Sequence, residues 1–239
     1  MAAQSNRLTI PEFAKYFDHT LLRADATDGA FDILCDDSMS YGFAMVAINP
    51  VAVSYCKRKL RDSDVHVGAA IGFPLGQNTM AAKLFETKDA LQNGADEIDY
   101  VIDITRLKAG DHDYIYKEMK QIVAACREYG ATSKVIFENC YLTDDEKRAL
   151  CGIAKDVKPD FIKTSTGFGT GGATVCDVKL MLDGVKGTGI KVKAAGGVRT
   201  LEAALEMIDL GVQRIGTSAS LAIVDAYKAK LGFGASIDN

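Results

Sequence analysis

The stretch that decides the fold prediction is "DFIKTSTGFGTGGAT", residues 160–174. It begins with a short apolar run typical of a buried strand and continues into a loop rich in glycine. Thr174, with Asp177 three positions later, has the spacing of a helix start. The stretch therefore predicts a strand, a loop and a helix in succession, and it sets one lysine, Lys163, at the end of the strand.

The same pattern recurs along the whole chain. Short runs rich in apolar and β-branched residues predict eight strands, at residues 16–20, 43–49, 65–72, 96–103, 133–138, 160–164, 190–194 and 213–217. They recur roughly every 28 residues, the length of one strand, one helix and two loops. We therefore expect an α/β fold, a closed (β/α)8 TIM barrel with eight helices, formed by residues 1–239 as a single domain.

Helical signals lie between the predicted strands. Apolar residues keep helical spacing in two of these segments: Met80, Leu84 and Leu91 in the first, and Ile115, Met119, Ile122 and Cys126 in the second. Each stripe would pack on a sheet. Two further helix starts are predicted, by the capping-box spacing of Thr143 and Glu146 and by Thr200 followed by Glu202.

Composition excludes several classes of function. The chain has 239 residues and a formal net charge of −4, with Lys and Arg scattered along it, so we expect no nucleic-acid partner. It has no run of about 18 apolar residues and no secretory signal pattern near the N-terminus, so we expect a cytoplasmic protein with no membrane partner. Small molecules are the expected partners, and a homodimer is the one protein assembly considered.

Neither cysteine nor histidine spacing indicates a metal site. The six cysteines are far apart with no CxxC, which is typical of reduced thiols rather than of a disulfide framework. His19, His66 and His112 lie in three different segments, so zinc ligation by clustered histidines is not predicted. We expect no metal and no cofactor, and a structural hydrogen-bonding role for His19.

Charged residues occupy the predicted carboxyl ends of strands, where barrel enzymes carry their chemistry. Lys163, Lys193 and Asp99 would converge there. Two close lysines lower each other's pKa, and a neutral lysine amine is a nucleophile toward carbonyl groups. This predicts a Schiff-base lysine, Lys163, with Lys193 lowering its pKa and Asp99 relaying protons. The alternative is a solvated rim or a structural ion network.

Strand parity predicts a second layer of charge. Glu97, Lys134 and Lys191 share the parity of the residues that face the barrel interior. Because buried charges need partners, we expect an ion network beneath the active-site layer.

The glycines of the 160–174 stretch have two interpretations. Gly167, Gly169 and Gly172 match GxGxxG, but a dinucleotide site also needs an acidic residue at the end of the next strand, where Ala194 and Ala195 stand instead. Backbone amides at a phosphate are the favoured interpretation, because barrels bind phosphate between their last loops. The contributing residues would be Gly167, Gly196, Gly197 and the turn from Gly216 to Ser218. Tight turns without a ligand remain the alternative.

Nine motifs in order along the chain resemble those of the deoxyribose-phosphate aldolases. They are "DHT" (18–20), "VAINP" (46–50), "IGFPLG" (71–76), "ETKDA" (86–90), "GADEID" (94–99), "KVIFE" (134–138), "DFIKTSTGF" (160–168), "KAAGGVRT" (193–200) and "RIGTS" (214–218). The resemblance implies a class I, metal-independent aldolase on a TIM barrel. Such an enzyme cleaves 2-deoxy-D-ribose 5-phosphate to acetaldehyde and D-glyceraldehyde 3-phosphate, so phosphorylated sugars and aldehydes are its expected partners.

The resemblance also implies roles for single residues. Lys163 falls on the Schiff-base lysine, Lys193 on the second lysine and Asp99 on the proton-shuttling aspartate. Substrate-contacting positions fall on Asp18, Thr20 and Thr166, and the phosphate site on Gly167, Gly196, Gly197, Gly216 and Ser218. The chain departs from the family at Ala47, where many members have Cys, at Phe168, where some have Lys, and at Ala219, where some have a second Ser.

Two other functions stay open on the sequence. A metal-dependent aldolase would need clustered histidines. A catalytically silent phosphate-binding barrel would keep the glycines but would have no use for Lys163, Lys193 and Asp99 together.

Overall fold

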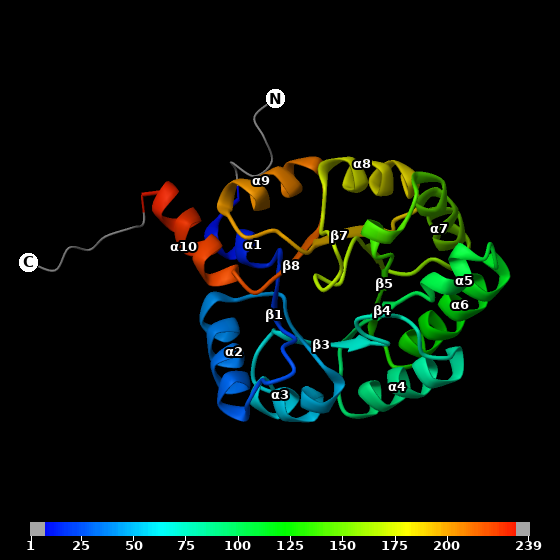
Figure 1. Ribbon diagram of the computed structural model, residues 1–239. Helices are drawn as coiled ribbons and strands as arrows, with labels where there is room; N and C mark the ends of the chain where they lie inside the picture. Colours follow the sequence, from blue (N-terminus) through cyan, green and yellow to red (C-terminus); the bar gives the residue numbers. More distant parts are fainter. Residues whose placement is uncertain (1–7, 233–239) are drawn as a thin grey trace, which may run out of the picture.

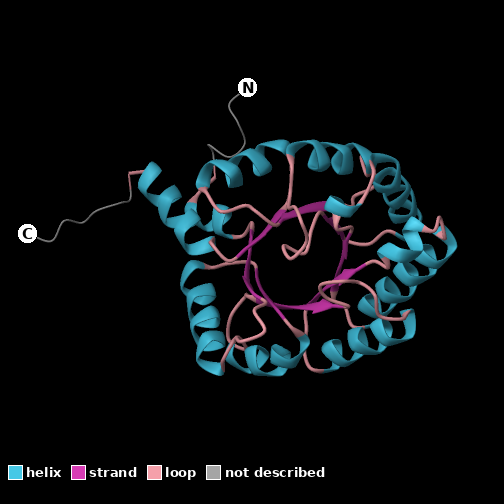
Figure 2. Cartoon of the chain, in the orientation of Figure 1, coloured by secondary structure: helices cyan, strands magenta, loops and turns pink. Residues whose placement is uncertain are grey.

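A computed structural model describes residues 8–232, and in it eight parallel strands form a closed barrel in the order of the sequence, from β1 to β8. Helices surround the strands on all sides (Figures 1 and 2). Each strand pairs in parallel with the next one along the chain, and β8 pairs with β1 to close the ring. The TIM-barrel prediction is confirmed.

Each of the eight predicted runs overlaps one strand, and three strands (β1, β5 and β7) extend one residue beyond the predicted run. The strands are β1 (Phe17–Leu21), β2 (Met45–Ile48), β3 (His66–Ile71), β4 (Glu97–Val101), β5 (Thr132–Ile136), β6 (Phe161–Lys163), β7 (Lys191–Ala195) and β8 (Arg214–Thr217). Most are shorter than predicted, because apolar sequence continues beyond the last ladder hydrogen bond into the loops. The run 96–103, for example, ends as a strand at Val101.

One main helix follows each strand. The eight are α2 (Asp28–Tyr41), α3 (Val53–Lys59), α4 (Met80–Gln92), α6 (His112–Glu128), α7 (Asp144–Val157), α8 (Val175–Gly184), α9 (Leu201–Leu210) and α10 (Ser220–Lys230). Short helices that the sequence analysis did not predict are α1 (Ile10–Ala14), α5 (Ile104–Lys108), η2 (Pro50–Ala52) and η3 (Asn139–Tyr141). None of the helices within residues 8–232 is long and apolar enough to cross a bilayer.

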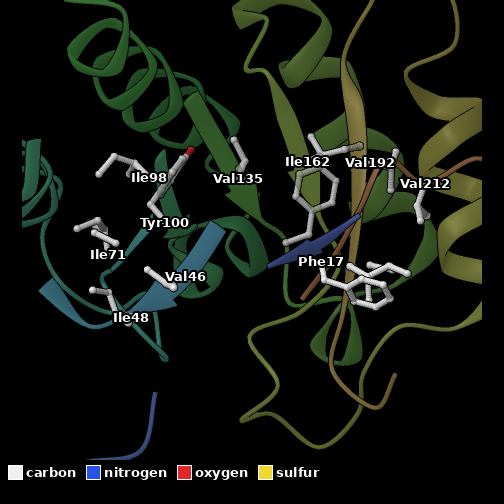
Figure 3. Close-up of a cluster of buried hydrophobic side chains, with 14 of the residues drawn as sticks. Phe17, Val46, Ile48, Ile71, Ile98, Tyr100, Val135, Ile162, Val192 and Val212 are labelled. Carbon is white, nitrogen blue, oxygen red and sulfur yellow. The ribbon is translucent and has the colours of Figure 1, made fainter. Parts of the chain in front are cut away.

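Alternation along the strands separates the apolar core from the polar interior of the barrel. Side chains of one parity, such as Val46, Ile98 and Val135, are fully buried between the strands and the helices (Figure 3). The opposite parity on β4 carries Glu97 and Asp99, which are buried as well. Because both faces of a parallel barrel are covered, burial on one strand does not separate apolar from charged residues.

The predicted helix starts are present. The Thr143 side chain accepts a hydrogen bond from the backbone N–H of Glu146, whose carboxylate accepts from the Thr143 N–H at 2.7 Å, so the capping box of α7 is complete. Thr174 caps α8 and Thr200 caps α9 in the same way, through their side-chain oxygens. These local signals work because a cap satisfies amide groups that no other part of the helix can reach.

The predicted stripe of α4 is only partly correct. Of its three residues only Leu91 is buried, and the packed face of the helix also carries Lys83 and Thr87. Lys83 is fully buried and pairs with Glu118 of α6 at 2.7 Å. Its Nζ also donates to the carbonyl oxygen of Val101 at 2.8 Å, which fastens α4 to the end of β4. Helical spacing within α4 cannot predict that Lys83 is buried, because its partner, Glu118, lies on a different helix.

The α7 capping box gives a stability prediction. Thr143→Ala removes the side-chain acceptor, so the free energy of unfolding should fall by about 1 kcal/mol. Urea denaturation followed by circular dichroism measures the change. Thr143→Ser is the control, because it keeps the hydroxyl, and it should retain most of the stability. Equal losses in the two variants would contradict a capping role for the hydroxyl.

Candidate active site

Three charged side chains meet inside the barrel at the carboxyl ends of the strands. Lys163 ends β6, and its register partner on β7 is Lys193. The Nζ atoms of these two lysines lie 2.8 and 2.7 Å from the same oxygen, Oδ2 of Asp99 on β4. Lys163, Lys193 and Asp99 are 4%, 0% and 3% exposed. The structure thus brings together the three residues that the sequence analysis placed at one site.

A second layer of charge lies beneath them. Lys134 of β5 donates to Asp99 Oδ1 at 2.7 Å, and it also pairs with Glu97 and, at 3.6 Å, with Asp18. Arg214 of β8 pairs with both Asp18 and Glu97, the latter at 2.7 Å. Glu97 and Lys134 are therefore part of an ion network, as predicted. Together with Lys163 and Lys193, the network links six strands of the barrel through side chains alone.

Lys191 does not join this network, so that part of the prediction is wrong. It is exposed at the amino end of β7, and its Nζ lies 5.4 Å from the ring centroid of Phe161. No acidic group within residues 8–232 pairs with it. Lys191 and Lys193 have the same parity on β7, so both were expected to face the barrel interior. At the first residue of the strand, however, the interior of the barrel already opens to solvent.

The charge balance explains the titration of Lys163. Four cationic groups (Lys134, Lys163, Lys193 and Arg214) face three carboxylates (Asp18, Glu97 and Asp99), and the ring of His66 also contacts Glu97 at 2.8 Å, so at least one positive charge is uncompensated when all the lysines, the arginine and the carboxylates are ionised. Burial, together with the nearby Lys193 and Lys134, lowers the pKa of Lys163 to about 8, although Asp99 opposes the shift. Lys163 is thus poised to give up its proton near neutral pH.

Asp99 remains ionised in this arrangement. Burial alone would raise its pKa, but the ammonium groups of Lys134, Lys163 and Lys193 hold the pKa of Asp99 well below its usual value. A carboxylate held in this way accepts hydrogen bonds from two or more ammonium groups and fixes their positions. Asp99 therefore sets the positions of the lysine side chains around it.

The residues expected to contact substrate fall into two groups. Asp18 is fully buried and pairs with Lys193 and Arg214, so its observed contacts are with the charged cluster. Thr166 is also buried, and its hydroxyl donates to Glu138. Thr20 instead lines an open cavity, with its hydroxyl donating to the carbonyl oxygen of Asp18 at 2.9 Å.

That cavity, of about 270 Å³, lies between the loops that follow β1, β6, β7 and β8. Its lining residues are Thr20, Leu21, Leu22, Arg23, Gly167, Phe168, Gly196, Gly197, Val198, Arg199, Gly216, Thr217 and Ser218. All five residues predicted to hold a phosphate are among them. A Cβ at Gly216 would lie 3.1 Å from Cε of Lys193, so the cavity adjoins the charged cluster.

Two arginines of the cavity were missed by the sequence analysis. Arg23 follows β1 and Arg199 follows the glycine pair after β7, and both line the cavity. They supply positive charge on a rim where Phe168, 57% exposed, supplies none. The position of Arg199 directly after "GGV" at a predicted strand end was a usable signal. Arg23 lies in a loop that carries no comparable motif.

Close packing between two loops explains the GxGxxG match. A Cβ at Gly172 would come within 2.2 Å of the carbonyl oxygen of Gly196, so only glycine fits. Beside this contact the Ala173 N–H donates to the carbonyl oxygens of Ala195 and Gly196, each at 3.0 Å. The third glycine of the motif therefore joins the β6–α8 and β7–α9 loops side by side around the cavity.

No group of three or more His, Cys, Asp or Glu side chains within residues 8–232 is arranged to hold a metal ion. The ring of His19 packs 5.2 Å from that of Phe43, and burial lowers the pKa of His19 to about 4. Its Nδ1 has no hydrogen-bond partner in the same part of the chain, so the expected hydrogen-bonding role is not seen at that atom.

Comparison with known proteins gives consistent matches over nearly the full chain. The family model of the DeoC/LacD family aldolases matches residues 13–235. A deoxyribose-phosphate aldolase of Lactobacillus acidophilus is 54% identical over 225 residues, covering 94% of each chain. One from Thermococcus gammatolerans is 50% identical over 219 residues, covering 91% of this chain and 97% of the relative.

Solved structures agree with this. A deoxyribose phosphate aldolase from Aeropyrum pernix, described as a tetramer, has a TM-score of 0.87 and 31% sequence identity, and the match covers 94% of this chain and 95% of that one. A dihydrodipicolinate synthase from Bacillus anthracis matches with a TM-score of 0.64 at 14% identity, which shows a shared fold alone.

The charge balance predicts how Lys163 titrates. Its amine should be half neutral near pH 8, and Lys193→Leu should raise this midpoint by about one unit or more, because it removes a positive neighbour. Competitive labelling of the amine across pH, followed by peptide mass spectrometry, measures the midpoint. Lys191→Leu is the matched control on the same strand and should leave it unchanged. An unchanged midpoint in Lys193→Leu would contradict the pKa-lowering role of Lys193.

Proposed function

The chain belongs to the DeoC/LacD family of aldolases, and we propose that it reversibly cleaves 2-deoxy-D-ribose 5-phosphate to D-glyceraldehyde 3-phosphate and acetaldehyde. The reaction proceeds through a Schiff base on Lys163. The observation that carries this proposal is the environment of Lys163, which is buried, lies 2.8 Å from Asp99 and has a pKa lowered to about 8. The names of the relatives support the choice of substrate.

Catalysis begins with the neutral amine of Lys163. At pH 7 a group with a pKa of 8 is neutral in about a tenth of the molecules, far more than an ordinary lysine. The amine attacks the aldehyde carbon of the open-chain sugar, the oxygen gains a proton, and water leaves to give an iminium ion. Lys193, 2.7 Å from Asp99, is placed to supply and recover protons for these steps.

The iminium is the electron sink for carbon–carbon cleavage. When the hydroxyl on C3 loses its proton, the C2–C3 bond breaks, glyceraldehyde 3-phosphate forms, and the bonding electrons pass to the enamine on Lys163. Protonation of C2 restores an iminium, and water then releases acetaldehyde and the free amine. Asp99 accepts hydrogen bonds from the Lys163 and Lys193 ammonium groups. These bonds keep the reacting amine of Lys163 next to Lys193, the group that supplies and recovers protons.

The cavity beside this cluster suits the phosphate of the substrate. Gly167, Gly196, Gly197, Gly216 and Ser218 contribute backbone amides, and the cavity adjoins the N-terminal end of α10. Arg23 and Arg199 line the cavity and supply the charge. Thr20, on the same lining, is placed to contact the sugar hydroxyls.

A catalytically silent phosphate-binding barrel is the competing function. It would need the loop amides and the arginines, but it would not need a buried lysine whose pKa lies near neutrality. Incubation with acetaldehyde and borohydride separates the two functions. A reduced two-carbon adduct on Lys163 supports the aldolase, and the absence of any adduct supports a binding protein.

Replacing the nucleophile gives the sharpest test. Lys163→Arg keeps a positive charge next to Asp99 but cannot form an imine, so cleavage of deoxyribose 5-phosphate should fall by several orders of magnitude and borohydride trapping should disappear. A coupled assay for glyceraldehyde 3-phosphate measures the rate. Lys191→Arg, the same change at the solvent-exposed lysine of β7, is the control. Retention of about a tenth of the rate in Lys163→Arg would refute the assignment.

A further inference from the structure

Glu138 is a buried carboxylate that the catalytic cluster does not use. It lies just beyond β5, is 1% exposed, and has φ 56° and ψ 60°, in the left-handed region. Only one other residue besides glycine among those described has a positive φ, Lys158, and that residue caps the end of α7. A left-handed backbone is strained at a residue other than glycine, so it persists where the surrounding contacts impose it.

Donors on the β6–α8 loop satisfy this carboxylate. Among residues 8–232 no lysine, arginine or histidine pairs with Glu138. Its Oε1 accepts the backbone N–H of Thr166 at 3.1 Å, and its Oε2 accepts the Thr166 hydroxyl. The Cys140 thiol, outside this loop, makes a longer contact with Oε1 at 3.9 Å. The loop also passes close above it, since a Cβ at Gly169 would lie 3.3 Å from Cδ of Glu138.

The bond to Glu138 determines what the Thr166 hydroxyl can do. A hydroxyl has one hydrogen, and here that hydrogen goes to Glu138. The Thr166 oxygen in turn accepts the backbone N–H of Phe168 at 3.0 Å. The hydroxyl therefore has no proton left to donate to an anionic ligand, and it holds the loop in shape.

These bonds leave the Gly167 amide unused. The N–H groups of Thr166 and Phe168 are both taken, whereas the N–H of Gly167 between them has no partner within residues 8–232. Gly167 lines the cavity and has φ 89°, a conformation that strains other residues. Of the two loop residues that line the cavity, Gly167 and Phe168, only Gly167 thus has an N–H without a partner within residues 8–232, at the place where the proposed function needs a phosphate donor.

We propose that Glu138 is a positioning residue that sets affinity for the phosphate group of the substrate. It acts through Thr166: its carboxylate fixes Thr166 and Phe168, and the fixed loop presents the Gly167 N–H to the phosphate. The identity of the ligand rests on the proposed function, while the bonds that shape the loop do not. Glu138 itself lies beneath the loop and makes no contact with the substrate.

Glu138→Gln tests this role with little change in volume. The amide nitrogen of glutamine cannot accept a hydrogen bond, so one of the two Thr166 donors loses its acceptor. KM for deoxyribose 5-phosphate should rise about tenfold, while kcat/KM for unphosphorylated deoxyribose and the rate of borohydride trapping at Lys163 should change less than about twofold. The split between the two substrates separates positioning of the loop from general damage to the site.

Asp160→Asn is the matched control. Asp160 Oδ2 accepts the backbone N–H and the hydroxyl of Ser133 at 2.9 and 2.8 Å, the same pair of bonds, but at the amino end of the barrel. The amide oxygen of asparagine can accept both bonds, so this variant removes a carboxylate charge without removing a hydrogen bond, and it should keep the wild-type KM for both substrates. A similar rise in KM in the control would show that loss of a carboxylate charge far from the loop has the same effect, and it would overturn the proposal.

Variants of Thr166 test the same bond from its other side, and they serve if Glu138→Gln fails to fold. Thr166→Val removes the hydroxyl and should raise KM for the phosphorylated substrate selectively, whereas Thr166→Ser keeps the hydroxyl and should raise this KM far less. If both residues act through one bond, KM for the phosphorylated substrate in the double variant Glu138→Gln with Thr166→Val should be no higher than in the single variant with the higher KM. Fully additive effects would contradict action through Thr166.

Failure of this inference is distinguishable from failure of the proposed function. If the wild-type protein cleaves deoxyribose 5-phosphate and Glu138→Gln leaves its KM unchanged, or weakens both substrates equally, the positioning role is wrong and the function stands. If the wild-type protein does not cleave the substrate, binding of inorganic phosphate by thermal shift still tests the loop. Weaker phosphate binding by Glu138→Gln than by Asp160→Asn supports the proposal, and equal or absent binding overturns it.

Discussion

The site depends on one carboxylate that is shared by three ammonium groups. Asp99 binds Lys134 through Oδ1 and both Lys163 and Lys193 through Oδ2. Two lysines would not remain close together in a dry interior without such a partner, because an unpaired buried charge costs several kcal/mol. The carboxylate therefore allows the lysines to be neighbours, and their proximity together with their burial is what makes the amine of Lys163 easy to deprotonate.

Buried acids on the two sides of this barrel mouth are stabilised in different ways. Asp99 and the network beneath it are compensated by cations, so a proton removed from Lys163 reduces the excess positive charge of the cluster. Glu138 is compensated by a backbone N–H and a hydroxyl, neither of which titrates near neutral pH. The first arrangement suits proton transfer, whereas the second suits a loop whose shape must stay constant while the chemistry proceeds.

Local patterns predicted most of the fold, and their failures have a common cause. Apolar runs located all eight strands, and the capping box of Thr143 located the start of α7, because both depend on neighbours within a few residues. The predicted apolar stripe of α4 was only partly correct because the buried face of the helix includes Lys83, whose partner, Glu118, lies on another helix. The prediction that Lys191 joins the ion network was wrong because strand parity gives the direction of a side chain but not the depth at which the barrel opens to solvent.

The sequence by itself determined the order of strands and helices and the convergence of Lys163, Lys193 and Asp99, because the ends of parallel strands in a closed barrel must meet. Only the tertiary structure decided which charges pair and in what number. Arg214 reaches Asp18 across 196 positions of the chain, and Glu138 reaches Thr166 across 28. No periodicity or local motif encodes such contacts, since they depend on how side chains from different strands share a few ångströms of buried space.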